Sequence, residues 1–278
     1  MLCLCLKIQN SLLHAFCNRK GFLKVGVIKN IGLRRINLIL ALVHFAQGTA
    51  VALLSQDLQV PLKTDHLVFD ANTSSLVVAQ KQLGTFSLPV LIVLFFYLSA
   101  AAHLLVATVY YRRYAENLKK GINRARWYEY SLSASVMMVA ISMLVGVSDV
   151  SIFVTIFALT AFMNMMGLVM EVSNSGTKKV SWLSYKIGSL AGLVPWAIVV
   201  YYFYASAQYG GAKPPTFVYW IFVSIFFFFS CFAVNMWLQY KKIGKWKNYL
   251  YGERVYMVLS LVAKAALAWQ IFAGTLRP

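Results

Sequence analysis

The stretch Val255–Ala273 reads VYMVLSLVAKAALAWQIFA, and its only side chain that is charged in neutral water is Lys264. A helix rises about 1.5 Å per residue, so Lys264 lies about 15 Å beyond Arg254 at the basic edge of this run. That depth is near the middle of a ~30 Å hydrocarbon layer, where an isolated ammonium costs at least ~3 kcal/mol. We therefore expect the amine to be paired, held neutral or used in a covalent bond. A lysine that is salt-bridged only for packing, or that reaches back to the membrane surface, is the alternative.

The rest of the chain has the composition of a membrane protein that crosses the bilayer several times. Of its 278 residues, 60% are hydrophobic and only 12% are charged. The sequence predicts an all-α protein in which a basic arm, residues 1–35, precedes one seven-helix domain, residues 36–278. The expected spans are 36–56, 86–110, 127–147, 150–172, 184–205, 217–240 and 254–276.

A net charge of +18 suggests nucleic-acid binding until the charges are mapped onto these spans. The N-terminal arm and the loops on its side of the membrane hold 21 Lys and Arg residues, whereas the opposite side holds four. The positive-inside rule therefore predicts a cytoplasmic N-terminus and an extracellular C-terminus. The basic loops are explained as topology signals near anionic lipid, so no nucleic-acid partner is expected.

The loop between the first two spans is long, at about residues 57–85, and it contains two β-rich runs. His66-Leu-Val-Phe and Leu76-Val-Val-Ala flank the turn-forming stretch Asp70-Ala-Asn-Thr-Ser-Ser. This pattern predicts an extracellular β-hairpin. The hairpin could cap the bundle, contact a partner subunit or have no further role.

Two of the eight acidic residues, Glu129 and Glu171, are expected to reach bundle depth. Glu129 is the best candidate counterion for Lys264. By hydropathy the third span begins only two residues before Glu129, so we expect the pairing to require a helix that extends back to about Lys119. Otherwise Glu129 is an interfacial residue paired with Arg126 across one turn. Glu171 is expected to be a helix-end or gate residue.

Several other polar and aromatic residues are candidates for the surroundings of the amine. Ser260 precedes Lys264 by one helical turn and shares its face. His44, Gln47 and His103 could build a polar cavity with Glu129. The many aromatic and methionine residues of the later spans could be ordinary packing or the wall of an elongated apolar ligand pocket.

Seven spans, the motif Arg126-Trp-Tyr-Glu-Tyr-Ser-Leu-Ser-Ala-Ser, the motif Ser260-Leu-Val-Ala-Lys264 and a cytoplasmic N-terminus together resemble the heliorhodopsins, microbial-type retinal proteins of inverted topology. The resemblance implies all-trans retinal as a protonated Schiff base on Lys264, with Glu129 as sole counterion. It implies that Ser260, Ser133, His44, Gln47 and His103 line the Schiff-base region. The further pocket residues expected are Trp127, Tyr130, Met163, Gly167, Trp196 and Phe229. It also implies a homodimer with the hairpin in the contact.

The membrane acids do not form the relay of a light-driven proton pump. An outward pump of the usual microbial type has a second carboxylate about eleven residues after the first, and here Ala140 occupies that place. We therefore expect a sensory or regulatory photoreceptor, not an enzyme, with an unknown cytoplasmic signalling partner. The alternative is a light-gated proton channel that uses Glu129 and Glu171. A metal hydrolase built on His44 and His103 would need three convergent ligands, and no His-x-x-His pair is present, so no metal is expected.

Overall fold

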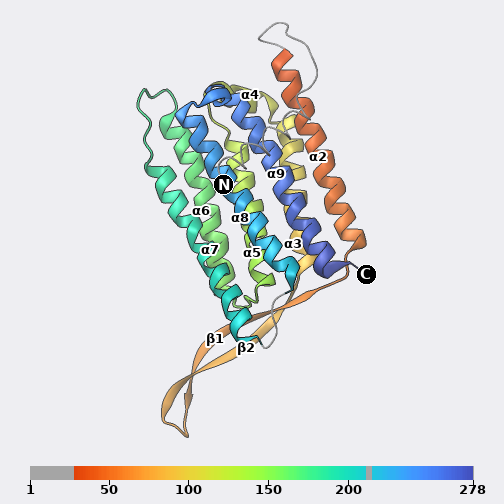
Figure 1. The fold of residues 1–278 in the computed structure, drawn as a ribbon, viewed down its shortest axis with the longest axis vertical. Helices are drawn as coiled ribbons and strands as arrows, with labels where there is room; N and C mark the ends of the chain where they lie inside the picture. The colour runs from red at the N-terminus through yellow and green to blue at the C-terminus, as the bar shows by residue number, and fades with distance from the viewer. Residues whose placement is uncertain (1–27, 211–214, 278) are drawn as a thin grey trace.

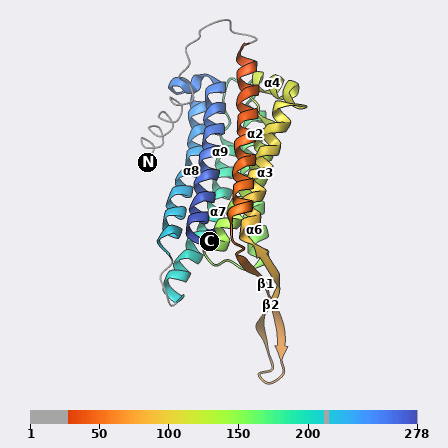
Figure 2. The same cartoon turned by 90° about the vertical axis from the view of Figure 1, so that its right-hand side faces the viewer.

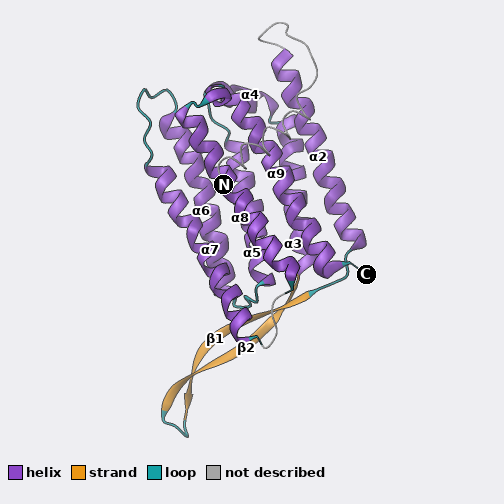
Figure 3. Cartoon of the chain, in the orientation of Figure 1, coloured by secondary structure: helices purple, strands orange, loops and turns teal. Residues whose placement is uncertain are grey.

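The computed structural model describes residues 28–210 and 215–277, in which long helices stand side by side and a two-stranded hairpin projects from one end (Figure 1). Figure 3 shows that the strands are confined to this hairpin within the described residues. The long helices are α2 (Ile28–Leu54), α3 (Leu88–Ala107), α5 (Arg124–Leu144), α6 (Val150–Asn174), α7 (Leu183–Tyr209), α8 (Thr216–Lys241) and α9 (Tyr249–Ile271). The short elements are α4 (Tyr111–Lys119), η1 (Gly244–Lys247) and η2 (Phe272–Leu276).

The long helices correspond to the expected spans, with two differences: the first helix begins earlier than expected, and α5 is less apolar than the other six. Helix α2 begins at Ile28, inside the segment expected to be an arm, and residues 1–27 of that arm lie outside the described residues. In the described part of the chain, six helices are long and apolar enough to cross a membrane. The remaining long helix, α5, is not among these six. It has 21 residues, but Glu129 and four serines lower its hydropathy.

Helix α5 tolerates these polar residues because it is surrounded by protein. It packs against α3, α6 and α7, and most of its residues are buried. Its second half, Val136–Ile141, belongs to an apolar core that also includes Leu267 and Ile271 of α9. The polar first half of α5 therefore faces other helices, where hydrogen-bond partners replace water.

The hairpin connects α2 to α3 and consists of β1 (Gln59–Asp70) and β2 (Ser75–Ser87), paired antiparallel. At its turn, the backbone of Asn72 donates to the carboxylate of Asp70 at 2.9 Å, which lowers the pKa of Asp70 from its usual value. At its base, the backbone N–H of Lys63 donates to the carbonyl of Ser148 at 2.8 Å, so the hairpin is tied to the α5–α6 connection. Figure 2 shows that the rest of the hairpin extends away from the helices.

The two ends of the bundle differ, and we name them by their contents. The hairpin end carries β1 and β2, together with the α5–α6 connection. The basic end carries α4, the α6–α7 connection and η1, where most of the loop lysines and arginines lie.

Candidate functional site

The buried amine of Lys264 is paired. Its Nζ lies 3.1 Å from Oε1 of Glu129, and the two side chains are 4% and 7% exposed. Nζ also donates to Oγ of Ser260 at 2.7 Å, as their one-turn spacing on α9 predicts. The hydroxyl of Ser99 on α3 donates to Oε1 of Glu129 at 2.6 Å, a contact that the sequence did not reveal. The ring of Tyr130 lies 5.3 Å from Nζ and offers a cation–π contact.

The expectation that helix 3 must extend back to about Lys119 for this pairing is wrong. Helix α5 begins at Arg124, and Asn123 caps it by accepting the backbone N–H of Arg126 at 3.1 Å. A turn with Gly121 at φ +72° separates α5 from α4. The pairing forms without the extension because helical side chains point back toward the N-terminus of their helix. The amine of Lys264 is thereby brought toward the start of α5, where Glu129 lies.

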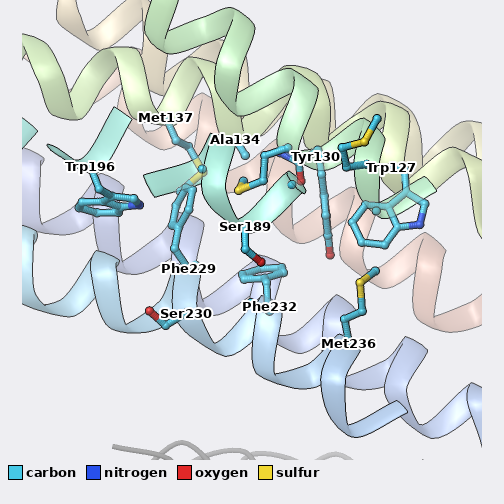
Figure 4. A pocket seen from close by; sticks show the side chains of 18 of the residues that line it. Trp127, Tyr130, Ala134, Met137, Ser189, Trp196, Phe229, Ser230, Phe232 and Met236 are labelled. Carbon is cyan, nitrogen blue, oxygen red and sulfur yellow. The ribbon is translucent and has the colours of Figure 1, made fainter. Parts of the chain in front are cut away.

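An elongated apolar cavity of about 260 Å³ begins at this pair. Figure 4 shows Trp196 near one end of the cavity and Trp127 near the other, with Phe229, Phe232 and Tyr130 between them. The ring of Trp196 meets the ring of Phe229 edge-on, with centroids 5.6 Å apart. The expected site residues that line this cavity are Lys264, Ser260, Ser133, Trp127, Tyr130, Met163, Gly167, Trp196 and Phe229.

Glycines shape the wall of this cavity. A Cβ added at Gly167 of α6 would overlap the indole ring of Trp127, and one at Gly192 of α7 would overlap the sulfur of Met163. Both neighbours line the cavity, so a side chain at either glycine would push them toward the space a ligand needs. Gly192 was not among the expected site residues.

The two histidines lie together, and neither lines this cavity. His44 is fully buried, and its ring stacks on that of His103 with centroids 5.6 Å apart. Nδ1 of His103 is 2.8 Å from Oδ1 of Asn37. Neither ring nitrogen of His44 has a hydrogen-bond partner among the described residues. Gln47 accepts a hydrogen bond from the indole of Trp269 at 3.3 Å.

A second ion cluster lies between the Lys264–Glu129 pair and the basic end. Arg126 is bound by both Glu171 and Glu253, and these three residues are 7%, 1% and 1% exposed. Arg126 therefore pairs with Glu171 and Glu253, and not with Glu129 as the alternative in the sequence analysis required. It also corrects the expectation that only Glu129 and Glu171 reach bundle depth, because Glu253 does so as well.

A spacing in the sequence could have identified Glu253. Glu253, Ser260 and Lys264 follow one another at intervals of seven and four residues, which places all three on one face of a helix. Hydropathy misplaced Glu253 because it stands next to Arg254 at the edge of the apolar run. In the described part of the chain, no three His, Cys, Asp or Glu side chains are grouped to hold a metal ion.

Comparisons with known proteins show the family and the fold of this chain. A family model described as Heliorhodopsin matches residues 33–276. A light-driven proton pump from Leptosphaeria maculans has a similar structure, with TM-score 0.60 and 16% identity over 90% of this chain and 97% of that one. Cyanorhodopsin from the cyanobacterium Tolypothrix is similar at TM-score 0.54 and 13% identity, over 88% and 95% of the two chains. A search of curated protein sequences found no significant match.

Proposed function

Because this chain belongs to the heliorhodopsin family and is an integral membrane protein with a retinal chromophore, we propose that it is a light sensor that does not pump ions. In this proposal all-trans retinal is bound at Lys264, and Glu129 is its counterion. The observation that carries the proposal is the position of the Lys264 amine, which is buried, paired and open to an apolar cavity.

The residues of the cavity fit an elongated apolar molecule that reacts with an amine. The lining is mostly aromatic, methionine and glycine, and its polar groups include Ser133, Ser260 and Lys264 near the ion pair. Bound as a Schiff base on Nζ, retinal supplies light absorption and isomerisation. The rings of Trp196 and Phe229 restrict the far part of the cavity, while Glu129 holds the positive charge at its near end.

The polar groups beside the ion pair would hold the proton after light absorption. In our proposal the proton displaced from Nζ moves to Glu129, passes on to the space beside His44 and His103, and returns from there. The unsatisfied ring nitrogens of His44 support this assignment, because buried polar atoms without partners are rare and often face water. Slow return of the proton would give a signalling state time to act.

The two ends of the bundle suggest the orientation and the contacts of the sensor. We assign the basic end to the cytoplasm, in accordance with the positive-inside rule, and with it the contact to a signalling partner. The hairpin end and the C-terminus are then extracellular. The hairpin exposes Leu67, Phe69, Leu76 and Val78 by more than 60% each, so we assign to it a contact within a homodimer.

Light should produce no sustained transport of protons. Between Glu129 and the hairpin end, the interior face of α5 runs through the buried apolar stretch Val136–Ile141, including Ala140 where a pump would carry a carboxylate. Net transport needs groups that take up and release protons on both sides of the amine. Illuminated vesicles should therefore show no steady pH change that a protonophore abolishes. A steady acidification or alkalinisation would contradict the proposal, and passive photocurrents under voltage clamp would favour the channel alternative.

Gly167→Ala should weaken retinal binding. The added methyl group would meet the ring of Trp127, and overpacking of this kind typically costs about 1–3 kcal/mol. We expect a reduced yield of the visible absorption band after retinal is added, together with a shifted maximum. Gly32→Ala in α2 is the matched control, since nothing lies within 4 Å of a Cβ there. Equal yields from the two variants would show that Trp127 does not bound the retinal site.

A further inference from the structure

The ion cluster of Arg126, Glu171 and Glu253 contains one positive and two potentially negative side chains, all buried. Two carboxylates that share a buried site are not both ionised, because like charges at short range disfavour each other and burial adds to the effect. One guanidinium balances one carboxylate. The charge count therefore requires one proton on the carboxylates for the cluster to be neutral.

The hydrogen bonds indicate which carboxylate carries that proton. Glu171 accepts from four donors, one on each of Arg126, Asn123, Trp127 and Tyr249, at distances between 2.5 and 3.0 Å. Glu253 accepts from Arg126 and from the amide of Asn123, and it shares the hydroxyl of Tyr249 with Glu171. More donors stabilise the charged form of a carboxylate. Glu171 is therefore the ionised member and Glu253 the protonated one.

A small cavity connects Glu253 to the counterion of the amine. Its volume is about 40 Å³, which exceeds the roughly 10–15 Å³ that one water molecule requires. Glu253, Glu129, His103 and Arg126 all line it, whereas Glu171 does not. The buried hydroxyl of Tyr114 and the side chain of Asn37 also line it. These groups supply the two to four polar contacts that a buried water molecule needs.

We propose that Arg126, Glu171 and Glu253 hold one buried proton in the dark, carried by Glu253, and that water in this cavity links the proton to Glu129. The proposal rests on the proposed function as a light sensor. After light absorption, the charges of Lys264 and Glu129 change. The water between Glu129 and Glu253 then reorients, and the hydrogen bond that the O–H of Glu253 donates to this water changes. Glu253 is on α9, Arg126 on α5 and Glu171 on α6, so the change reaches three helices near their basic ends.

Other titratable groups around the cluster do not alter this count. Those that face it are tyrosines: Tyr114 from α4, Tyr130 from α5, Tyr240 from α8, and Tyr249 and Tyr256 from α9. Phenols are neutral at physiological pH. Across the small cavity stand Glu129 and His103, of which Glu129 is already balanced by Lys264.

Infrared difference spectroscopy of the retinal-loaded full chain, light minus dark, tests the proposal. A protonated carboxyl group has a carbonyl stretch separate from that of a carboxylate, and the stretch shifts in heavy water. Protonation of Glu129 gives a carboxyl band of its own, which Glu129→Gln removes. Apart from that band, we expect a light-induced carboxyl band that is lost in Glu253→Gln and shifted in Glu253→Asp. The band should be retained in Glu116→Gln, whose exposed side chain pairs with Arg112 on α4. Tyr114→Phe, which removes a contact of the water, should also shift the band.

If no carboxyl band is present besides that of Glu129, or if Glu253→Gln leaves every carboxyl band unchanged, the proposal is overturned. The visible absorption of the same samples separates this result from a failure of the proposed function. A chain that shows no light-induced visible change is not a light sensor, whereas one that photoreacts with an unchanged band lacks only the proton on Glu253.

Thermal unfolding of the retinal-free variants provides a second measurement. Glu253→Gln replaces a neutral group by a neutral group and should unfold near the temperature of the parent chain. The double variant Glu171→Gln/Glu253→Gln leaves the buried charge of Arg126 unpaired and should unfold at a markedly lower temperature. If Glu253→Gln alone falls as far as the double variant, or unfolds above the parent chain, then Glu253 is ionised and the proposal is wrong.

Discussion

Lys264→Ala should abolish visible absorption entirely, leaving the spectrum of the retinal-free protein. The variant removes the only amine that lies at the cavity within the described residues, so no covalent bond to retinal can form there. It also leaves Glu129 buried without its partner, and breaking a buried ion pair in this way costs about 3–5 kcal/mol. The measurement is the absorption spectrum of the purified variant after expression with all-trans retinal.

The loss of stability must be separated from the loss of the bond. Lys264→Ala/Glu129→Gln removes both charges, so it should unfold at a higher temperature than Lys264→Ala while remaining colourless. Lys119→Ala, at an exposed position at the end of α4, should keep the full band. A visible retinal band in a folded Lys264→Ala variant would disprove the assignment of Lys264.

Glu129→Gln should move the absorption maximum to longer wavelength. The carboxylate 3.1 Å from Nζ stabilises a positive charge there in the ground state, and an uncharged amide stabilises it much less. The visible band should also disappear at a lower pH than in the parent chain, because the proton on the nitrogen is held less firmly. Both effects are measured by titrating the absorption spectrum of the variant.

The matched control is Ser99→Ala, which removes one donor to Glu129 and leaves the carboxylate in place. Its spectrum should change in position much less than that of Glu129→Gln. If Glu129→Gln has the spectrum and titration of the parent chain, Glu129 is not the counterion, whatever its distance from Lys264.

Much of this architecture could be predicted from hydropathy and charge. The apolar runs located the long helices, and turn residues between β-rich runs located the hairpin, which the structure confirms as β1 and β2. The start of α5 could not be predicted in this way, because hydropathy scales assume that a span faces lipid. Most of α5 is packed against other helices, so Arg126, Glu129 and the serines of α5 are compatible with a central position.

The candidate site could be predicted where its residues are spaced along one face of a single helix. Lys264 and Ser260 share a face of α9, and their hydrogen bond was expected from that spacing. Contacts between helices were harder to predict, since they depend on helix rotation and relative height. Ser99 reaches Glu129 from α3, and Arg126 pairs with Glu171 and Glu253 instead of Glu129. The hydrogen bond between Gln47 of α2 and Trp269 of α9 is another contact between helices that the sequence did not indicate.

Chemical trapping of the bond tests the central claim most directly. The retinal-loaded chain is reduced with borohydride, which makes the bond between an amine and retinal permanent, and is then digested with trypsin. Modified Lys264 resists cleavage, and trypsin does not cleave between Arg277 and Pro278, so mass spectrometry should find retinal on one peptide that starts at residue 255 and includes Pro278. Retinal on a different lysine, or a fully cleaved and unmodified Lys264 in a coloured sample, would contradict the account.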